Sequence, residues 1–345
     1  MISIKPYSIE SLSEWNAFNA RAKNGIFMFD RNYMDYHSDR FSDHSLMFYE
    51  DSRLLALLPL NLTNNILYSH QGLTFGGFIV GDSMRQQKML DCVELLHEYM
   101  QNHCFTRLVY KNIPYIYHKQ PAQEDLYALF RSGATLFRSD CSATINLKQP
   151  IKFSELRTRG VKKALKSEVI IESSQDFNSF VALLNSILQS RHNVRAVHST
   201  QELALLHSRF PRNIALYVAR QNNEILAGTL LFIYDNLVHT QYLAVNDKGR
   251  AIGALDLLIK TLIDKYTPTK QYFDFGISTE NNGLYLNEGL TAQKEGFGAR
   301  TTIHNVYNLT MGGGGVIALI VSIRFCFLQA RFTPQASLKA KRRVA

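Results

Sequence analysis

The feature that most constrains the fold of this 345-residue chain is an internal duplication. Residues 46–71 and 214–242 each contain two apolar runs joined by a polar turn, then a two-residue turn and a third run. The two-residue turns are Asn64-Asn65 in the first copy and Asp235-Asn236 in the second. Because Asn and Asp tolerate positive φ, such pairs favour hairpins. Each copy therefore predicts three antiparallel strands, and a repeated unit predicts a repeated fold.

The sequence after each strand triplet repeats as well. Residues 88–100 and 254–266 carry apolar side chains at helical spacing, and each segment precedes a short apolar strand at 107–110 or 272–275. Further helical sequence lies ahead of each triplet, at 9–22, 30–40, 176–191 and 200–209. These patterns predict an α+β protein of two tandem domains, each a mixed, mostly antiparallel sheet flanked by helices. We expect an N-terminal domain over 1–150, a C-terminal domain over 151–310, and a glycine-hinged apolar and basic tail over 311–345.

The formal net charge of +9 is concentrated at the C-terminal end of the sequence. Seven of the 38 Lys and Arg residues follow Glu295, and no Asp or Glu follows it. The rest of the chain is close to neutral. Nucleic-acid binding needs many clustered cations, so we do not expect a nucleic-acid substrate.

The cysteines and the apolar segments limit the cellular context. The four cysteines, Cys92, Cys104, Cys141 and Cys326, form no C-x-x-C pair and have no His at ligand spacing, so neither a disulfide framework nor a metal site is expected. The first seven residues lack an export signal, which favours a cytoplasmic protein. The most apolar window, 316–328, is too short to cross a bilayer. Peripheral contact of the tail with the inner face of the membrane and a non-functional extension remain as alternatives.

Two segments are candidate binding sites for an anionic ligand. Residues 156–166 contain five basic side chains, which form either a solvated helix face or a patch facing a cleft. The loop 246–253, Asn-Asp-Lys-Gly-Arg-Ala-Ile-Gly, stands between a strand and the helix that begins at Ala254. Glycines let backbone N–H groups approach a phosphate, and a helix N-terminus attracts negative charge. The matching loop of the first copy has a single glycine, which favours a diphosphate site in the second copy only.

The second half resembles the GNAT acyltransferase superfamily in its loop Arg250-x-x-Gly253-Ala254, and more specifically bacterial double-domain, Fem-like GNAT proteins. The specific resemblance lies in residues 273–283, 286–290 and 294–298, with Tyr307. It covers about residues 1–310 and is strongest from Phe210 to Leu309. It implies an acyl-CoA co-substrate, acetyl-CoA above all, whose diphosphate is bound at the loop and whose arm enters a splay between strands. The implied cofactor-binding residues are Val245, Asn246, Gly249, Arg250, Gly253 and Ala254.

The resemblance also implies a reaction and a pathway. Fem-like proteins of this type often act in surface-polysaccharide biosynthesis, so we expect N-acyl transfer to an amino sugar of a capsule or O-antigen precursor, either nucleotide-linked or lipid-linked. An aminoacyl-tRNA donor and a peptidoglycan acceptor form the second enzyme hypothesis. Such relatives commonly carry a long helical arm, and no charged heptad stretch of that length exists here, which favours a thioester donor. A non-catalytic scaffold in polysaccharide assembly is the third hypothesis.

Acyl transfer to an amine needs a base for the ammonium proton and donors for the oxyanion. The catalytic candidates are His239, Asp274 and Glu280, although Asp274 and Glu280 equally suit capping of the turns that follow them. Strand alternation predicts His239 and Gln241 on one face, with Thr240 and Tyr242 on the other. Substrate-binding candidates, each equally explained by a structural role, are Arg191, His192, His198, Tyr242 and Tyr285.

Overall fold

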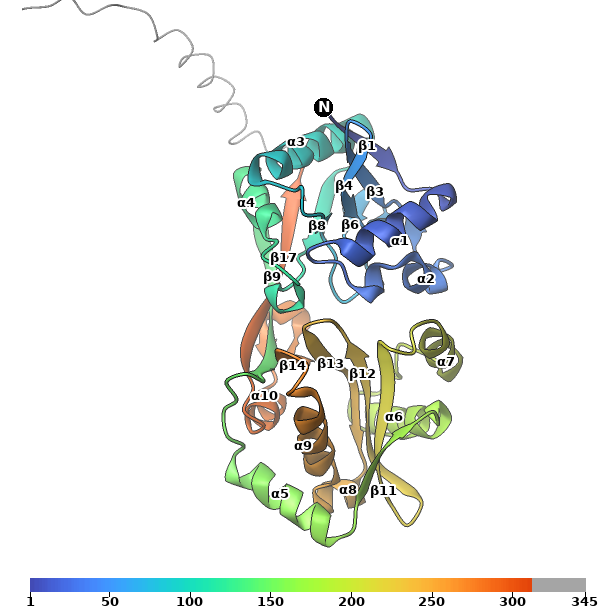
Figure 1. Ribbon diagram of the computed structural model, residues 1–345, viewed down its shortest axis with the longest axis vertical. Coiled ribbons are helices and arrows are strands. Elements are labelled where there is room, and N and C mark those ends of the chain that lie inside the picture. Colours follow the sequence, from blue (N-terminus) through green and yellow to red (C-terminus); the bar gives the residue numbers. More distant parts are fainter. Residues whose placement is uncertain (312–345) are drawn as a thin grey trace, which may run out of the picture.

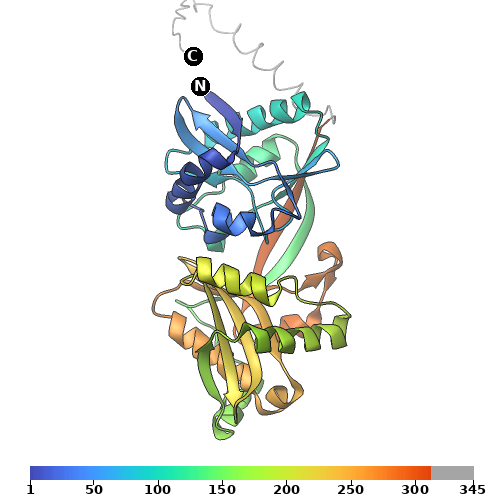
Figure 2. The ribbon, with the colours of Figure 1, turned by 90° about the vertical axis from the view of Figure 1, so that its right-hand side faces the viewer.

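The computed structural model describes residues 1–311, except for the side chains of Arg191 and His192 (Figure 1). The tail expected beyond residue 311, with its apolar window, lies outside the described residues. The described chain forms an upper, N-terminal half and a lower, C-terminal half (Figures 1 and 2). The predicted α+β class, with mixed and mostly antiparallel sheets flanked by helices, is confirmed.

The N-terminal half contains a four-stranded sheet whose two central strands are buried on both faces. Its strands are β1 (Ile2–Pro6), β3 (Leu46–Glu50), β4 (Arg53–Leu58) and β7 (Ile79–Val80), in the order β1-β3-β4-β7. Met47 and Tyr49 belong to one core with Trp15 of α1 (Leu12–Arg21). The alternate residues of β3 belong to a second core with α3 (Gln86–Asn102). This period of two explains why all of β3 but its last residue is buried.

The second sheet extends through both halves. It has eleven strands in the order β10-β11-β12-β13-β14-β9-β17-β8-β6-β5-β2. Their bounds are β2 Ser42–Asp43, β5 Asn61–Thr63, β6 Ile66–Tyr68, β8 Arg107–Lys111, β9 Thr135–Asn146, β10 Ile170–Ser174, β11 Ile214–Gln221, β12 Glu224–Ile233, β13 Leu237–Val245, β14 Tyr272–Ile277 and β17 Arg300–Thr310. A separate hairpin joins β15 (Thr279–Glu280) to β16 (Tyr285–Leu286).

The helices lie close to the ranges expected from their apolar spacing. Two of them, α7 (Thr200–Arg209) and α9 (Ala254–Tyr266), match the prediction at both ends. The segment 30–40 is broken into a short helix α2 (Arg31–Met34) and a 3-10 turn, η3 (Asp35–His37). The other helices are α4 Glu124–Arg131, α5 Glu155–Lys166, α6 Phe177–His192, α8 Asp247–Ile252 and α10 Glu288–Glu295, with 3-10 turns η1 Ile9–Ser11, η2 Phe27–Phe29, η4 Tyr115–Tyr117 and η5 Asn281–Gly283.

The two strand triplets do not fold alike, although each was expected to form one meander. In the second half, β11, β12 and β13 are consecutive antiparallel neighbours. In the first half, β4 and β5 belong to different sheets, and Pro59 lies between them. Proline cannot donate a ladder hydrogen bond, which is the physical reason for the break. Of the two-residue turns used in the prediction, Asn64-Asn65 has positive φ, whereas Asp235-Asn236 does not.

Two long strands connect the halves. β9 begins in the N-terminal half and ends beside β14 of the C-terminal half, while β17 runs back and ends beside β8 (Figures 1 and 2). β9 and β17 pair antiparallel from Thr144 and Arg300 to Thr135 and Asn308. Each half therefore contributes a strand to the other.

Candidate active site

The site begins where two parallel strands separate. β13 and β14 pair through only three positions, of which the last is His239 with Asp274. Beyond this position the edge of β13 has no strand partner within residues 1–311, so its backbone groups face a fork. Thr240 pairs with Leu231 and Tyr242 with Leu230 of β12, so Gln241 is an extra residue that forms a bulge in β13. The bulge changes the alternation beyond it, so Tyr242 lies on the face of His239: their partners Leu230 and Phe232 belong to one core, whereas Leu231, the partner of Thr240, belongs to another. At the fork, His239, Thr240 and Gln241 line one cleft.

Asp274 is fully buried and accepts four side-chain hydrogen bonds. One carboxylate oxygen accepts from Ser142 at 2.7 Å and Thr144 at 2.8 Å, both on β9. The other accepts from His239 Nδ1 at 2.7 Å and from the Tyr117 hydroxyl at 3.0 Å. Burial by itself would raise the pKa of Asp274, but the hydrogen bonds from His239 and Ser142 lower it below its ordinary range. Asp274 therefore stays ionised.

The hydrogen bond to Asp274 fixes the orientation of the His239 ring. Since Nδ1 donates to the carboxylate, the proton of the neutral ring is assigned to Nδ1, and Nε2 keeps its lone pair. The ring lines the cleft with about a tenth of its side chain exposed. Gly276, with φ of 76°, lies beside it, and a Cβ there would be 3.0 Å from His239 Cε1. This arrangement presents a nitrogen base to the cleft.

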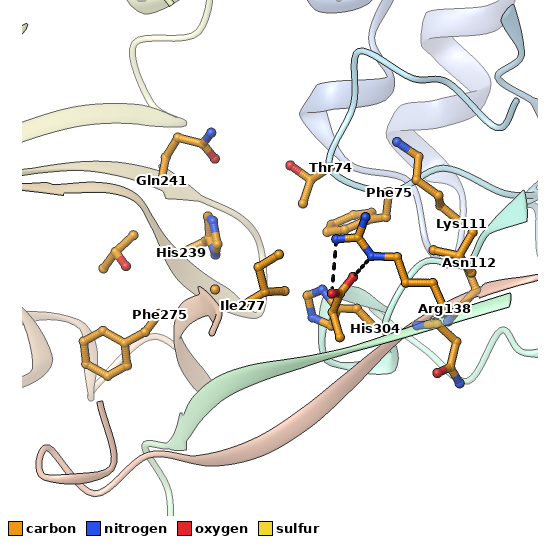
Figure 3. A pocket seen from close by; sticks show the side chains of 15 residues that line it. Thr74, Phe75, Lys111, Asn112, Arg138, His239, Gln241, Phe275, Ile277 and His304 are labelled. Carbon is orange, nitrogen blue, oxygen red and sulfur yellow. Dashed lines mark hydrogen bonds and ion pairs between the residues drawn. The ribbon is translucent and has the colours of Figure 1, made fainter. Parts of the chain in front are cut away.

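The cleft has a volume of about 380 Å³ and is formed by both halves (Figure 3). Figure 3 shows His239 and Gln241 on one side and Lys111, Asn112 and Arg138 on the other. The fifteen lining residues are Thr74, Phe75, Lys111, Asn112, Arg138, Asp140, His239, Thr240, Gln241, Phe275, Gly276, Ile277, His304, Asn305 and Val306.

Strand β9 supplies polar groups that the sequence analysis missed. Arg138, Asp140, Ser142 and Thr144 alternate along it and therefore share one face. Asp140 accepts from Arg138 at 2.7 and 3.1 Å and from Thr279 at 2.6 Å. The signal available in the sequence was the run of Arg, Asp, Ser and Thr at alternate positions of residues 138–144, because polar side chains that are buried on one face need partners.

Three groups in or beside the cleft that holds the His239–Asp274 dyad have pKa values lowered by burial. Burial lowers the pKa of Lys111 to about 7, with a smaller contribution from the charge of Arg138. Burial also lowers the pKa of His304, against the opposing charge of Asp274, so this ring is neutral. Burial lowers the pKa of Lys294 to about 8, and its Nζ donates to the carbonyls of Gly276 and Ile277 at 2.8 Å. Lys294 thereby fixes the end of β14 next to His239.

The predicted catalytic residues separate in space. His239 lines the cleft, and Asp274 lies behind it as a positioning residue rather than as a cap for the following turn. Glu280 is exposed on β15 and accepts a hydrogen bond from Asn287 at 2.8 Å, and it does not line the cleft.

The predicted substrate-binding residues do not gather at this cleft. His198 and Tyr242 bond to each other at 2.6 Å, and neither residue lines the cleft. Tyr285 is exposed on the β15–β16 hairpin. The side chains of Arg191 and His192 lie outside the described residues.

The predicted diphosphate loop folds as the short helix α8, and α5 packs over the turn that follows it. Asn246 caps α8 by accepting from the Gly249 amide at 2.7 Å, and the exposed Arg250 donates to the carbonyl of Val245. Gly253 has φ of 79°, and a Cβ there would be 2.3 Å from the carbonyl oxygen of Gly160 in α5. Ala254 at the start of α9 is fully buried. The glycine thus permits close helix packing, and the turn does not present an open cradle for a diphosphate.

Comparisons with known proteins agree with this fold. Residues 155–282 match the family model described as Acetyltransferase (GNAT) domain. The solved structure of FemX has a TM-score of 0.65 and 11% identity, and the match covers 89% of this chain and 97% of the FemX chain. The solved structure of L-PGS from Bacillus licheniformis has a TM-score of 0.59 and 14% identity, and the match covers 92% of this chain and 96% of L-PGS. A tandem GNAT protein from the clavulanic acid biosynthesis pathway has a TM-score of 0.51 and 11% identity, and the match covers 91% of this chain and 100% of that protein.

These comparisons show the class of fold: the chain has a tandem GNAT-like fold, and residues 155–282 of its second half are similar to the GNAT acetyltransferase domain. No curated protein matches the sequence. Within residues 1–311, no helix is long and apolar enough to span a membrane, and no group of three or more His, Cys, Asp or Glu side chains is arranged to hold a metal ion.

Proposed function

We propose that the protein transfers an acyl group from an activated ester or thioester to an amine acceptor bound in the cleft between its halves. The observation that carries this proposal is the His239–Asp274 pair at the fork of β13 and β14. Its free Nε2 lines the cleft, and its Nδ1 is held at 2.7 Å from a buried carboxylate.

The chain's own groups supply the base for this step. As the acceptor nitrogen attacks the acyl carbon, an N–C bond forms and the bond from that carbon to the leaving sulfur or oxygen breaks. Nε2 of His239 takes the proton that the nitrogen loses and returns it to the leaving group. Asp274 stabilises the resulting imidazolium, since it remains ionised beside Nδ1–H.

The fork provides a place for the acyl carbonyl. In the described part of the chain, the edge of β13 beyond His239 has no strand partner, so its N–H groups are available to a developing oxyanion. In this proposal Thr240 and Gln241 position the donor, and the wall formed by β8, β9 and β17 positions the acceptor. The acceptor we propose is an amino sugar on a nucleotide-linked or lipid-linked polysaccharide precursor, and the donor is an acyl-CoA, as the sequence resemblance implies.

The test is transfer of a labelled acyl group. Wild-type protein and H239N are incubated with labelled acetyl-CoA and a panel of amino-sugar precursors, and labelled product is counted. Loss of a general base lowers the rate about 100-fold or more, so H239N is expected to lose nearly all transfer. The matched control is H103N, because His103 is exposed at the end of α3. Equal rates for wild type and H239N would contradict the proposal.

A second candidate is the same acyl transfer with an aminoacyl-tRNA donor. The packing of α5 against Gly253 favours it, because a diphosphate at this turn would require α5 to move. Four cations of α5, Arg159, Lys162, Lys163 and Lys166, are exposed, and they would suit a phosphate backbone.

The two donors can be separated by thermal unfolding. A ligand at 100 times its Kd stabilises the folded protein by about 2.7 kcal/mol. Stabilisation by coenzyme A but not by tRNA supports the first candidate, and the reverse supports the second. Combined replacement of Lys162 and Lys163 by Ala should abolish stabilisation by tRNA and leave that by coenzyme A unchanged.

A further inference from the structure

Two cationic side chains of the cleft lie in register across three strands. Val306 of β17 is paired with Lys111 of β8 on one side and with Arg138 of β9 on the other. Residues opposite one another in adjacent strands point to the same face of a sheet. The Lys111 and Arg138 backbones are two strand spacings apart, about 10 Å, and both long side chains line the same cleft (Figure 3).

The charges of this pair are incompletely balanced. Arg138 is paired with Asp140 through two hydrogen bonds. Lys111 Nζ donates to the carbonyl of Leu73, and among the described residues no carboxylate oxygen lies within 4 Å of it. A partly buried ammonium beside a second cation is unfavourable unless it gains an anionic partner. The low pKa of Lys111, about 7, has this same origin in burial and in the charge of Arg138.

We propose that Lys111 and Arg138 form a subsite for an oxyanion carried by the acceptor, either a phosphate or a carboxylate. The subsite would select acceptors that bear a negative group and orient their amine toward His239. This inference rests on the proposed function for the identity of the bound molecule as an acceptor, but the anion site itself can be tested without any transfer.

The distance along β9 from Arg138 to the His239–Asp274 dyad predicts how far the acceptor's anionic group lies from its amine. Arg138 and Ser142 are four residues apart on β9, and Ser142 donates to Asp274 of the dyad. Four residues of strand span roughly 13 Å, and the Arg138 side chain leans along this direction to reach Asp140. The anionic group of the acceptor is thus expected on the order of 10 Å from its nucleophilic nitrogen. Phosphates of a nucleotide-linked or lipid-linked sugar and a carboxylate on an extended acceptor both satisfy this spacing.

The anion site is tested by calorimetric titration of the full chain with sulfate, inorganic phosphate and acetate. We expect sulfate and phosphate to bind with millimolar affinity, and K111M and R138Q each to weaken that binding at least tenfold. Acetate binding tighter than sulfate would assign the subsite to a carboxylate, and the reverse to a phosphate. The controls are K260M and R131Q, which replace cations of α9 and α4 outside the cleft and should bind as the wild type does.

One further variant separates this inference from the proposed function. H239N should bind sulfate normally, whatever its effect on transfer. Undiminished sulfate binding by K111M and R138Q, with both proteins folded by circular dichroism, would overturn the subsite. So would the absence of binding to the wild type at 50 mM sulfate, roughly tenfold above the expected range. A failure of acyl transfer with intact sulfate binding would overturn only the proposed function.

Discussion

At the scale of single residues, the geometry of His239 depends on the absence of a side chain at position 276. Gly276 has φ of 76° and a Cβ there would be 3.0 Å from His239 Cε1. We therefore expect Gly276→Ala to displace the ring and lower kcat at least tenfold, while destabilising the protein by about 1 kcal/mol or more. Chemical denaturation and initial rates measure the two effects.

The control for this variant is Gly289→Ala. Gly289 lies in α10, and its Cβ would meet only the Asn287 side chain at 3.8 Å. Alanine is the better helix former, so this variant should be neutral or slightly more stable, with unchanged rates. Equal activities for the two alanine variants would contradict the packing described for His239.

The oxyanion subsite should also depend on pH. The Lys111 pKa is about 7, so the ammonium is present below that pH and is lost above it. The charged and titratable groups facing Lys111 are Arg138 and Asp140 of β9, His304 of β17 and His70. Of these, His70 and His304 are neutral near pH 7, since burial lowers their pKa values.

Sulfate is the probe for this pH series because its charge does not change near neutrality. Its affinity should fall as the pH rises from 6 to 8.5, and K111R should remove most of that fall because Arg stays charged. The same fall in K111R as in wild type would assign the pH dependence to another group.

The sequence was sufficient to identify His239 and Asp274 as catalytic candidates, but it did not show that Asp274 positions the His239 ring. Alternation placed Gln241 correctly beside His239 and Thr240 correctly on the opposite face, but it placed Tyr242 on the wrong face, because Gln241 is an extra, bulged residue of β13 that no periodicity reveals. Lys111, Arg138 and His304 were missed since they come from strands distant in sequence. A glycine at a strand-to-helix turn has the same sequence signature whether it binds a phosphate or, as at Gly253, admits a neighbouring helix.

At the scale of elements, the position of α5 over the start of α9 makes a prediction about Gly253. Alanine at 253 would be both at positive φ and 2.3 Å from a backbone oxygen of Gly160. We expect Gly253→Ala to lower the free energy of unfolding by at least about 2 kcal/mol, from overpacking together with backbone strain.

Gly133 provides a matched control, because its φ is 77° and a Cβ there would meet nothing within 4 Å. Gly133→Ala should lower the free energy of unfolding by only about 1 kcal/mol, the contribution of positive φ. If denaturant unfolding gave equal losses for both variants, α5 would not lie against the turn in solution.

The elements themselves were the most predictable level of the structure. The termini of α7 and α9 follow from the apolar spacing, and in the structure the Ser199–Glu202 capping box fixes the start of α7. The membership of β4 and β5 in different sheets was not predictable from their apolar pattern, although Pro59 marks the position of the break.

At the scale of the whole molecule, the exchange of β9 and β17 makes the two halves interdependent. A fragment ending at residue 150 lacks β17, the partner of β8 and β9, and a fragment starting at 151 leaves β14 without β9. We expect residues 1–311 to unfold in one calorimetric transition, and neither fragment to fold alone. Mixing the unfolded fragments should restore the native circular dichroism spectrum. Two separate transitions, or a folded fragment, would contradict this interdependence.

The central claim is that one reaction uses both walls of the cleft, with the base on β13 and the acceptor's anion on β8 and β9. The most direct measurement is steady-state kinetics of H239N and K111M with an acceptor identified by label transfer. We predict that H239N lowers kcat about 100-fold or more with little change in acceptor KM, while K111M raises acceptor KM at least tenfold and leaves kcat within threefold. Wild-type values of both constants in either variant would contradict the claim.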